Sequence, residues 1–261
     1  MLSTAIAATG MLAQELNVEV ISNNIANVNT TGFKRQRAEF EDLLYQQQRA
    51  VGATSNENGA IVAAGVQIGT GVRAAAVYRI GEQGSLQSTG NNLDMAIQGK
   101  GFFEIEMPDG TLGYTRAGSF QLSPQGQIVT ADGYVLKPGI TVPPTATSVS
   151  VNNSGQVVVQ VAGQTATQTV GQLELSNFPN EVGLQNLGNN LLGETPASGN
   201  PVVGAASSTG FGTILQGFLE SSNVNVVTEI TNLISAQRAY EMNSKVIQVA
   251  DQMSSALNNL R

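Results

Sequence analysis

The sequence predicts an α+β protein in which discontinuous N- and C-terminal α-helices form a coiled-coil-like inner domain and a mainly antiparallel β domain occupies the centre. All but one of the 29 glycines lie between Gly32 and Gly217, and all eight prolines lie between Pro108 and Pro201. The two ends therefore almost lack the residues that cost roughly 1 kcal/mol (Gly) or 3 kcal/mol (Pro) inside a helix. Both ends also show a heptad-like spacing of apolar residues, which is typical of helices that pack together.

The N-terminal segment, residues 2–27, is the first expected helix. Its apolar residues follow spacings of four and three, which place them on one stripe of a helix. Residues on or next to this stripe are Leu2, Ile6, Leu16, Val20 and Ile25.

Helix-weakening residues follow this segment. The side chains of Asn27 and Asn29 compete for backbone hydrogen bonds, and the glycine of Gly32-Phe33 can adopt the left-handed conformation that stops a helix. We therefore expect a domain joint formed by Asn27, Asn29, Gly32 and Phe33.

The C-terminal segment, residues 224–260, is the second expected helix. Its apolar spacing slips by one position partway along, as expected because 3.6 residues per turn drift against a seven-residue repeat. Residues on this stripe include Val226, Ile230, Leu233, Tyr240, Ile247, Met253 and Leu257.

The segment between the two helices has the pattern of β-structure. Turn signals such as Pro108-Asp109-Gly110 and Asp132-Gly133 separate short alternating runs such as residues 102–107. Residues 46–64 show no period and predict a long loop or an irregular extended hairpin. The expected domains are residues 1–30 with 218–261 (helical polymerisation domain), 31–80 (connecting region) and 81–217 (β-rich outer domain).

Composition excludes several classes of protein. The net charge of -7 argues against a nucleic-acid partner, because acidic side chains repel phosphates. The chain has no cysteine and no histidine, so disulfides, the usual zinc ligands and a Ser-His pair are absent. We expect no cofactor and no metal. No apolar run approaches the ~20 residues that span a bilayer, so no membrane insertion is expected. The first basic residue is Lys34, so the basic start of a cleaved signal peptide is missing.

Few residues suggest chemistry. Glu104 and Glu106 lie two apart on a predicted strand and could share one face, but a solvated strand face is the better interpretation. An enzyme that uses this pair remains a distant alternative. The glycine pairs of 69–71 and 99–101 complete no phosphate-binding motif and favour tight turns. Lys34, Arg35 and Arg37 are followed by acidic residues, which favours a solvated or salt-bridged face over an anion site.

The terminal helices could pair within one chain, as an antiparallel hairpin, or serve assembly between chains. The N-terminal helix is too short to cover the C-terminal one, and the remaining positions are polar but mostly uncharged. We therefore predict a polymerisation interface. Its residues are Leu2, Ile6, Leu16, Val20, Ile25, Val226, Ile230, Leu233, Tyr240, Ile247, Met253 and Leu257.

Four segments resemble the bacterial flagellar basal-body rod and hook family. They are "SNNIANVNTTGFKRQRAEFEDLLY" (residues 22–45), "IQGKGFF" (97–103), "YTRAGSF" (114–120) and "LESSNVNVVTEITNLISAQRAYEMNSKVIQ" (219–248). They occur in the family's order and span essentially the whole chain. Within the family, "GVQIGTGVR" (65–73) is most similar to distal rod subunits.

The resemblance implies a non-enzymatic structural subunit of the distal rod. Such a subunit would polymerise into a helical tube that encloses the export channel and would act as a drive shaft from motor to hook. The implied partners are further copies of the chain, proximal rod subunits, the hook protein, the peptidoglycan and outer-membrane ring proteins, and the flagellar type III export apparatus. The implied location is the rod within the periplasm, reached without a cleaved signal peptide.

Two further alternatives stay open on the sequence. A proximal rod or hook subunit belongs to the same family. A β-rich surface adhesin or tail-like fibre with helical trimerising ends would also combine two helical ends with a β centre.

Overall fold

The computed structural model describes residues 2–49, 65–163 and 166–259, and these fall into two compact units. The helical unit comprises described residues within 1–26, 36–78 and 225–261, and the β unit comprises those within 27–35 and 79–224. The predicted fold class is confirmed, because the two terminal helices pack together and the segment between them is mainly antiparallel β-structure.

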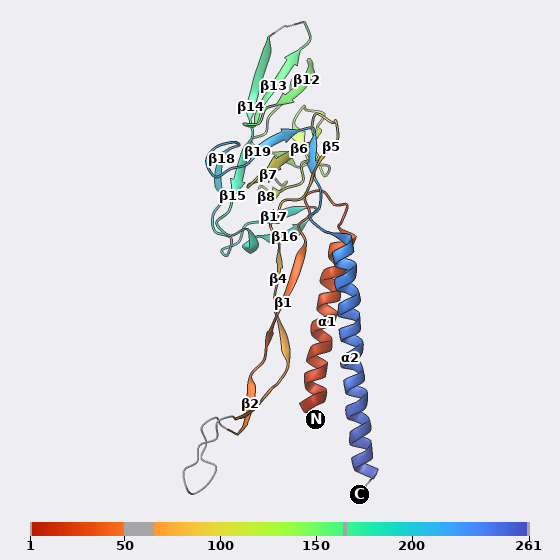
Figure 1. Ribbon diagram of the computed structural model, residues 1–261. Coiled ribbons are helices and arrows are strands. Elements are labelled where there is room, and N and C mark those ends of the chain that lie inside the picture. The colour runs from red at the N-terminus through yellow and green to blue at the C-terminus, as the bar shows by residue number, and fades with distance from the viewer. Residues whose placement is uncertain (1, 50–64, 164–165, 260–261) are drawn as a thin grey trace. The chain divides into compact units, whose positions relative to one another are not determined.

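The helical unit contains two antiparallel helices, α1 (Leu2–Ala26) and α2 (Val226–Asn259), which lie side by side in Figure 1. Both helices were predicted from the sequence within two residues of these bounds. Asn225 precedes α2 and its side-chain oxygen accepts a hydrogen bond from Thr228 N at 3.2 Å, so it acts as the N-cap.

A two-stranded ribbon completes the helical unit. Strand β1 (Gln36–Asp42) pairs with β4 (Val72–Arg79), and β2 (Tyr45–Arg49) pairs with β3 (Val66–Gly69). An isolated pair of strands is only marginally stable in water, so contact with α1 is needed to stabilise the ribbon. A Cβ at Gly71 would overlap Thr9 Oγ1, and Val72 N donates a hydrogen bond to this oxygen. The prediction of an irregular hairpin over 46–64 falls largely on residues outside the described ranges.

The β unit contains a nine-stranded sheet. Its main path is β16-β17-β8-β7-β11-β10-β9, with β15 beside β7 and β18 beside β15. The bounds are β7 (Phe102–Glu106), β8 (Leu112–Thr115), β9 (Gln121–Leu122), β10 (Ile128–Val129), β11 (Val135–Leu136), β15 (Glu174–Asn177), β16 (Gln185–Gly188), β17 (Leu191–Gly193) and β18 (Val202–Ala205).

Smaller sheets surround it. A three-stranded antiparallel sheet has the order β12-β13-β14, while β6 pairs with β19 and β5 pairs with β20. The bounds are β5 (Leu86–Ser88), β6 (Met95–Gln98), β12 (Ala146–Val151), β13 (Gln156–Val161), β14 (Thr167–Gln172), β19 (Thr213–Gln216) and β20 (Phe218–Glu220), with one 3-10 turn at Glu181–Gly183.

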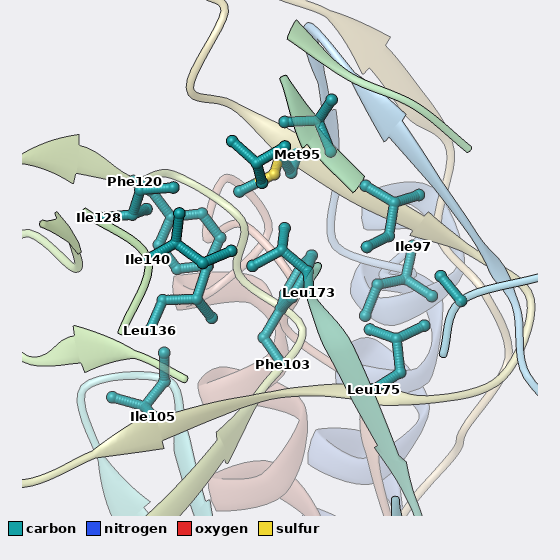
Figure 2. Close-up of a cluster of buried hydrophobic side chains, with 14 of the residues drawn as sticks. Met95, Ile97, Phe103, Ile105, Phe120, Ile128, Leu136, Ile140, Leu173 and Leu175 are labelled. Atoms are coloured by element: carbon teal, nitrogen blue, oxygen red, sulfur yellow. The ribbon is translucent and has the colours of Figure 1, made fainter. Parts of the chain in front are cut away.

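Strand β7 separates two apolar clusters. Its side chains alternate between the faces of the sheet, so Phe103 and Ile105 enter the larger cluster and Phe102 enters the smaller one. Phe103 meets Phe120 edge to face, with ring centroids 5.2 Å apart, in the cluster that Figure 2 shows. The strand is therefore buried on both sides, and this is the core of the β unit.

Tyr114 lies in the smaller cluster with its hydroxyl buried. Among the described residues this hydroxyl has no hydrogen-bond partner. Burial, together with the nearby Glu104 and Glu194 carboxylates, raises the pKa of Tyr114 to about 12. A buried hydroxyl without a partner costs free energy, because it has lost its hydrogen bonds to water.

We expect Tyr114→Phe to raise the free energy of unfolding by about 1 kcal/mol, because the unpartnered hydroxyl is removed and the ring stays. The phenol ionises in the unfolded chain near its usual pKa of about 10. The unfolded chain therefore loses the phenol proton at a lower pH than the folded chain does. The contribution of Tyr114 to the free energy of unfolding is complete below pH 10 and is lost as the pH rises toward 12.

Urea unfolding of both proteins between pH 8 and pH 12 measures this. The loss of stability above pH 10 should be smaller in the variant. A variant that is less stable than the parent at pH 8 would contradict the assignment.

Candidate functional site

The buried residues of the two helices include several small and polar side chains beside apolar ones. Buried residues of α1 include Ala7, Ala13 and Val20, and those of α2 include Ala236 and Ala250. A Cβ at Gly10 would lie 2.8 Å from Asn243 Nδ2, so the helices approach closely at this glycine. Several larger apolar side chains of α2 are nevertheless exposed.

A polar cluster joins three elements of the helical unit. The Asn24 side chain donates to Gln36 O at 2.8 Å and accepts from Gln36 N at 2.8 Å, so it pairs with the start of β1 like a neighbouring strand. Its amide nitrogen also donates to Glu229 Oε2 at 3.2 Å. Asn24 and Glu229 are both buried, and Glu229 lies in the first turn of α2, where the helix dipole stabilises a carboxylate. This cluster specifies how the two helices pair.

The predicted interface residues take different places on the helices. Val20 is buried, and a half-buried group lies at or beside the contact between the helices. This group contains Leu2, Ile6, Leu16, Ile25, Leu233 and Ile247. A third group is exposed and contains Val226, Ile230, Tyr240 and Met253. The side chain of Leu257 lies outside the described side chains, and the assignment of the whole set to polymerisation stays a prediction.

Other exposed apolar side chains were missed by the sequence analysis. Val227 of α2 is 75% exposed, Met242 is 62% exposed and Leu12 of α1 is 66% exposed. Ile234, Val246 and Val249 add to this surface. We call the exposed apolar residues of α2 the α2 stripe. They are Val226, Val227, Ile230, Ile234, Tyr240, Met242, Val246, Val249 and Met253. The sequence signal that could have identified these residues is the presence of apolar side chains on more than one face of the predicted helix.

The predicted joint residues lie in a turn at the start of the β unit. After α1 ends at Ala26, Thr30 N donates to Asn27 O at 3.2 Å, and Phe33 N donates to Thr30 O at 3.3 Å. Asn29 is exposed and Phe33 is half-buried. Gly32 has the left-handed conformation that the sequence suggested, with φ +68°.

Gly32 is fixed by two constraints. Its N–H donates to Glu220 O at 2.8 Å. A Cβ at this position would lie 2.7 Å from Ala117 N, closer than Cβ atoms normally approach a neighbour. A side chain at position 32 would therefore meet both an unfavourable φ and a backbone clash.

The Glu220 cluster is a buried ion network that the sequence analysis missed. The Glu220 carboxylate accepts hydrogen bonds from Lys34 Nζ, from Arg116 Nε at 2.9 Å and from Gly84 N at 2.9 Å. The side chain of Glu220 has no exposed surface, and that of Lys34 is 12% exposed. Burial lowers the pKa of Lys34, opposed by the Glu220 carboxylate and assisted by the Arg116 charge. Of the two expected surroundings, solvated or salt-bridged, Lys34 has the second, because its side chain is 12% exposed and pairs with Glu220.

All four segments that carry the family resemblance meet at this cluster. Lys34 belongs to the first segment, Arg116 to the third and Glu220 to the fourth. The second contributes backbone, since Arg116 Nη1 donates to Gly99 O and Gly101 O, each at 2.8 Å. The glycine pair at 99–101 therefore presents carbonyl oxygens to an arginine, which agrees with a tight turn.

Asn223 reinforces the same region. Its side-chain oxygen accepts from Arg35 N at 2.7 Å, and its side-chain nitrogen donates to Ile80 O and Glu82 O, each at 3.0 Å. Ile80 N in turn donates to Arg35 O at 2.9 Å. The segments that follow α1 and precede α2 are thus fixed to each other and to the start of the β domain.

The carboxylates of Glu104 and Glu106 lie in different surroundings. Glu104 is buried, accepts from Lys137 Nζ at 3.1 Å and from Ser176 Oγ at 3.0 Å, whereas Glu106 is exposed. The expectation of a solvated face is wrong for Glu104, because its carboxylate is buried and bonded to the side chains of Lys137 and Ser176. Within the described ranges no group of three or more His, Cys, Asp or Glu could hold a metal ion. None of the described helices is long and apolar enough to cross a membrane.

Comparison with protein families gives matches over three parts of the chain. A model of flagella basal body rod proteins matches residues 5–34, a model of the flagellar hook protein FlgE/F/G D1 domain matches 96–159, and a model of the flagellar basal body rod FlgEFG protein C-terminal region matches 215–260. The three matches include Lys34, Arg116 and Glu220.

Full-length relatives agree with these matches. The chain is 58% identical to the flagellar basal-body rod protein FlgG of Caulobacter vibrioides, over 98% of this chain and 97% of that protein. It is 52% identical to FlgG of Agrobacterium fabrum, over 99% of this chain and 98% of that protein. It is 40% identical to FlgG of Bacillus subtilis, over 97% of this chain and 96% of that protein.

We expect Gly32→Ala to lower the free energy of unfolding by about 3 kcal/mol, because the left-handed φ and the clash with Ala117 N add. Gly133→Ala is the matched control. Gly133 has φ +85°, and a Cβ there would have nothing within 4 Å, so only the φ penalty of about 1–2 kcal/mol applies. Urea unfolding measures both, and equal losses would contradict the close approach at Gly32.

We expect Glu220→Gln to lower the free energy of unfolding by about 3–5 kcal/mol, because Lys34 and Arg116 stay buried without a counter-charge. Glu82→Gln removes the same charge from a side chain that is 71% exposed and pairs with Arg35 at 3.6 Å. That control should change stability by at most about 0.5 kcal/mol. Similar urea midpoints for the two variants would show that the Glu220 cluster has no structural importance.

Proposed function

The chain belongs to the FlgG family of flagellar basal-body rod proteins, and we propose that it is a subunit of the distal rod that polymerises into a helical tube. The tube would transmit torque from the motor to the hook and enclose the export channel. Near-full-length identity to FlgG proteins is the observation that carries this proposal. The family is one of structural rod proteins, in agreement with the prediction that the chain is not an enzyme.

The location and partners follow from this role. We place the protein in the rod within the periplasm, in contact with further copies of itself, proximal rod subunits, the hook protein and the ring proteins of the peptidoglycan and outer membrane. Passage through the flagellar type III export apparatus belongs to the same proposal.

The α2 stripe supports assembly through the helical unit. A single chain leaves Val227 75% exposed and Met242 62% exposed, although burial of such a side chain contributes about 1.5–3 kcal/mol. Because these residues lie on more than one face of α2, further copies that cover them would gain this free energy. We propose an inner polymerisation domain within residues 1–30 and 218–261, a connecting region of 31–80 and an outer domain of 81–217. Residues 27–30 and 218–224 pack within the β unit, and the described residues of 36–78 within the helical unit.

The Glu220 cluster suits a shaft that carries torque. The chain enters the β unit shortly after α1 and leaves it shortly before α2, and both passages are held there by Lys34 and Glu220. Buried ion pairs with additional hydrogen bonds resist deformation, because a displaced charge loses its only compensation. Within the β unit, such a network would resist separation of the entering and leaving segments under load.

We expect Ile230→Asp to abolish rod growth and motility while leaving the secreted subunit folded. Ile230 is 44% exposed in the single chain, so its charge disturbs the stripe and spares the contact with α1. Gln248→Asp adds the same charge at an exposed polar position of α2 and should preserve motility. Swimming assays, with circular dichroism of the purified subunits, measure both effects. Normal rods from the Ile230→Asp strain would refute assembly through this surface.

A proximal rod or hook position is the near alternative. Imaging of a labelled copy of this protein in purified basal bodies decides between them. The label should lie between the proximal rod and the hook if the distal assignment is right.

A further inference from the structure

A small cavity adjoins the Glu220 cluster within the β unit. Its volume is about 130 Å³. Three cationic side chains line it, Lys34, Arg79 and Arg116, together with one carboxylate, Glu181, and the apolar Phe102 and Leu192. A rod role requires no ligand, so the concentration of positive charge around one cavity calls for a separate explanation.

The charges around the cavity do not balance. Lys34 and Arg116 share the single carboxylate of Glu220, and among the described residues Arg79 has no ion pair within 4 Å. Glu181 adds a second carboxylate, whose longer-range effect acts on Lys34 and Arg79. Three positive charges therefore face two negative ones, in a protein whose net charge is -7. Burial of an uncompensated charge is costly, and a bound anion would relieve that cost.

Hydrogen-bond donors are also left over. Lys34 Nζ uses two of its three N–H groups, on Glu82 O and Glu220. Arg79 uses three of its five N–H groups, on Asn186 Oδ1, Glu181 O and Leu184 O. The remaining donors have no acceptor among the described residues. Lysine and arginine donors of this kind bind carboxylate and phosphate oxygens strongly, because the hydrogen bonds are charge-assisted.

The geometry points to a binding site for one small oxyanion, a carboxylate or phosphate group, held between Lys34 and Arg79. The cavity volume limits the ligand, because pockets for drug-sized molecules or cofactors have roughly 300–1,000 Å³. The occupant is either a free anion or the carboxylate of an acidic side chain on a second copy of this chain. Burial lowers the pKa of both Lys34 and Arg79, and a bound anion would raise both pKa values again.

The first experiment titrates the full chain with sodium acetate and with inorganic phosphate, against sodium chloride at matched ionic strength. NMR shifts of the Lys34 and Arg79 region and the melting temperature report binding. We expect saturable shifts at the cavity and a higher melting temperature with the oxyanions than with chloride, because a ligand that binds only the folded chain stabilises it.

Three variants separate a specific site from general screening. Arg79→Gln should weaken binding about tenfold or more, because a charge-assisted hydrogen bond is lost. Glu181→Gln should tighten binding severalfold, because it removes the carboxylate that opposes the anion. Lys100→Gln removes an exposed cation that does not line the cavity and should leave the affinity unchanged.

Absence of saturable shifts in the parent protein would overturn the proposal, and so would equal weakening by Arg79→Gln and Lys100→Gln. If Arg79→Gln does not fold, Glu181→Gln decides, because unchanged or weaker binding in that variant contradicts the charge argument. None of these outcomes depends on rod formation, so the site can fail while the rod function stands.

A second experiment identifies the source of the anion. Sedimentation of the full chain is compared with and without saturating acetate, at matched ionic strength. Weaker self-association in acetate assigns the site to an acidic side chain of a second copy, because acetate competes with it. Unchanged self-association assigns it to a free anion.

Discussion

The Glu220 carboxylate is the interaction on which the β unit's connections depend. It is buried, it forms ion pairs with both Lys34 and Arg116, and the backbone oxygen of the same residue accepts the N–H of Gly32. One residue thereby fixes the segment that follows α1, the arginine after β8 and the segment that leads to α2. A buried carboxylate with two cationic partners tolerates little displacement, because a cation that moved away would stay buried and unpaired.

All four segments that carry the family resemblance contribute to this cluster. The glycines at 99 and 101 place carbonyl oxygens around the Arg116 guanidinium, and Gly32 lets the backbone approach Ala117 N. Each segment thereby contributes a side chain or a backbone group to the cluster. The two helices pack together through small, polar and some apolar side chains, and the α2 stripe stays exposed. Close pairing within a chain and apolar contact between chains can thus use different faces of one helix.

Local sequence patterns predicted the helices and the β character of the centre, because helix periodicity and glycine turns act over a few residues. They could not predict the partners of Lys34, since Glu220 lies 186 residues away in the chain. They also placed Glu104 in solvent, because nothing near it in the sequence announces that Lys137 and Ser176 cover it. The spacing of apolar residues in the sequence indicated the apolar faces of α2. Which of these faces packs against α1 depends on Gly10 and Asn24 of α1, which are distant in the sequence.

The most direct test of assembly through the α2 stripe is photo-crosslinking in assembled rods, with a photoreactive residue at Ile234 in one strain and at Ala236 in another. Ile234 is 45% exposed on the α2 stripe, whereas Ala236 is buried beside α1. We expect an adduct of two copies of the chain from Ile234 and only intrachain products from Ala236. Rods that form normally and give no such adduct from Ile234 would contradict the claim that the stripe joins one copy to the next.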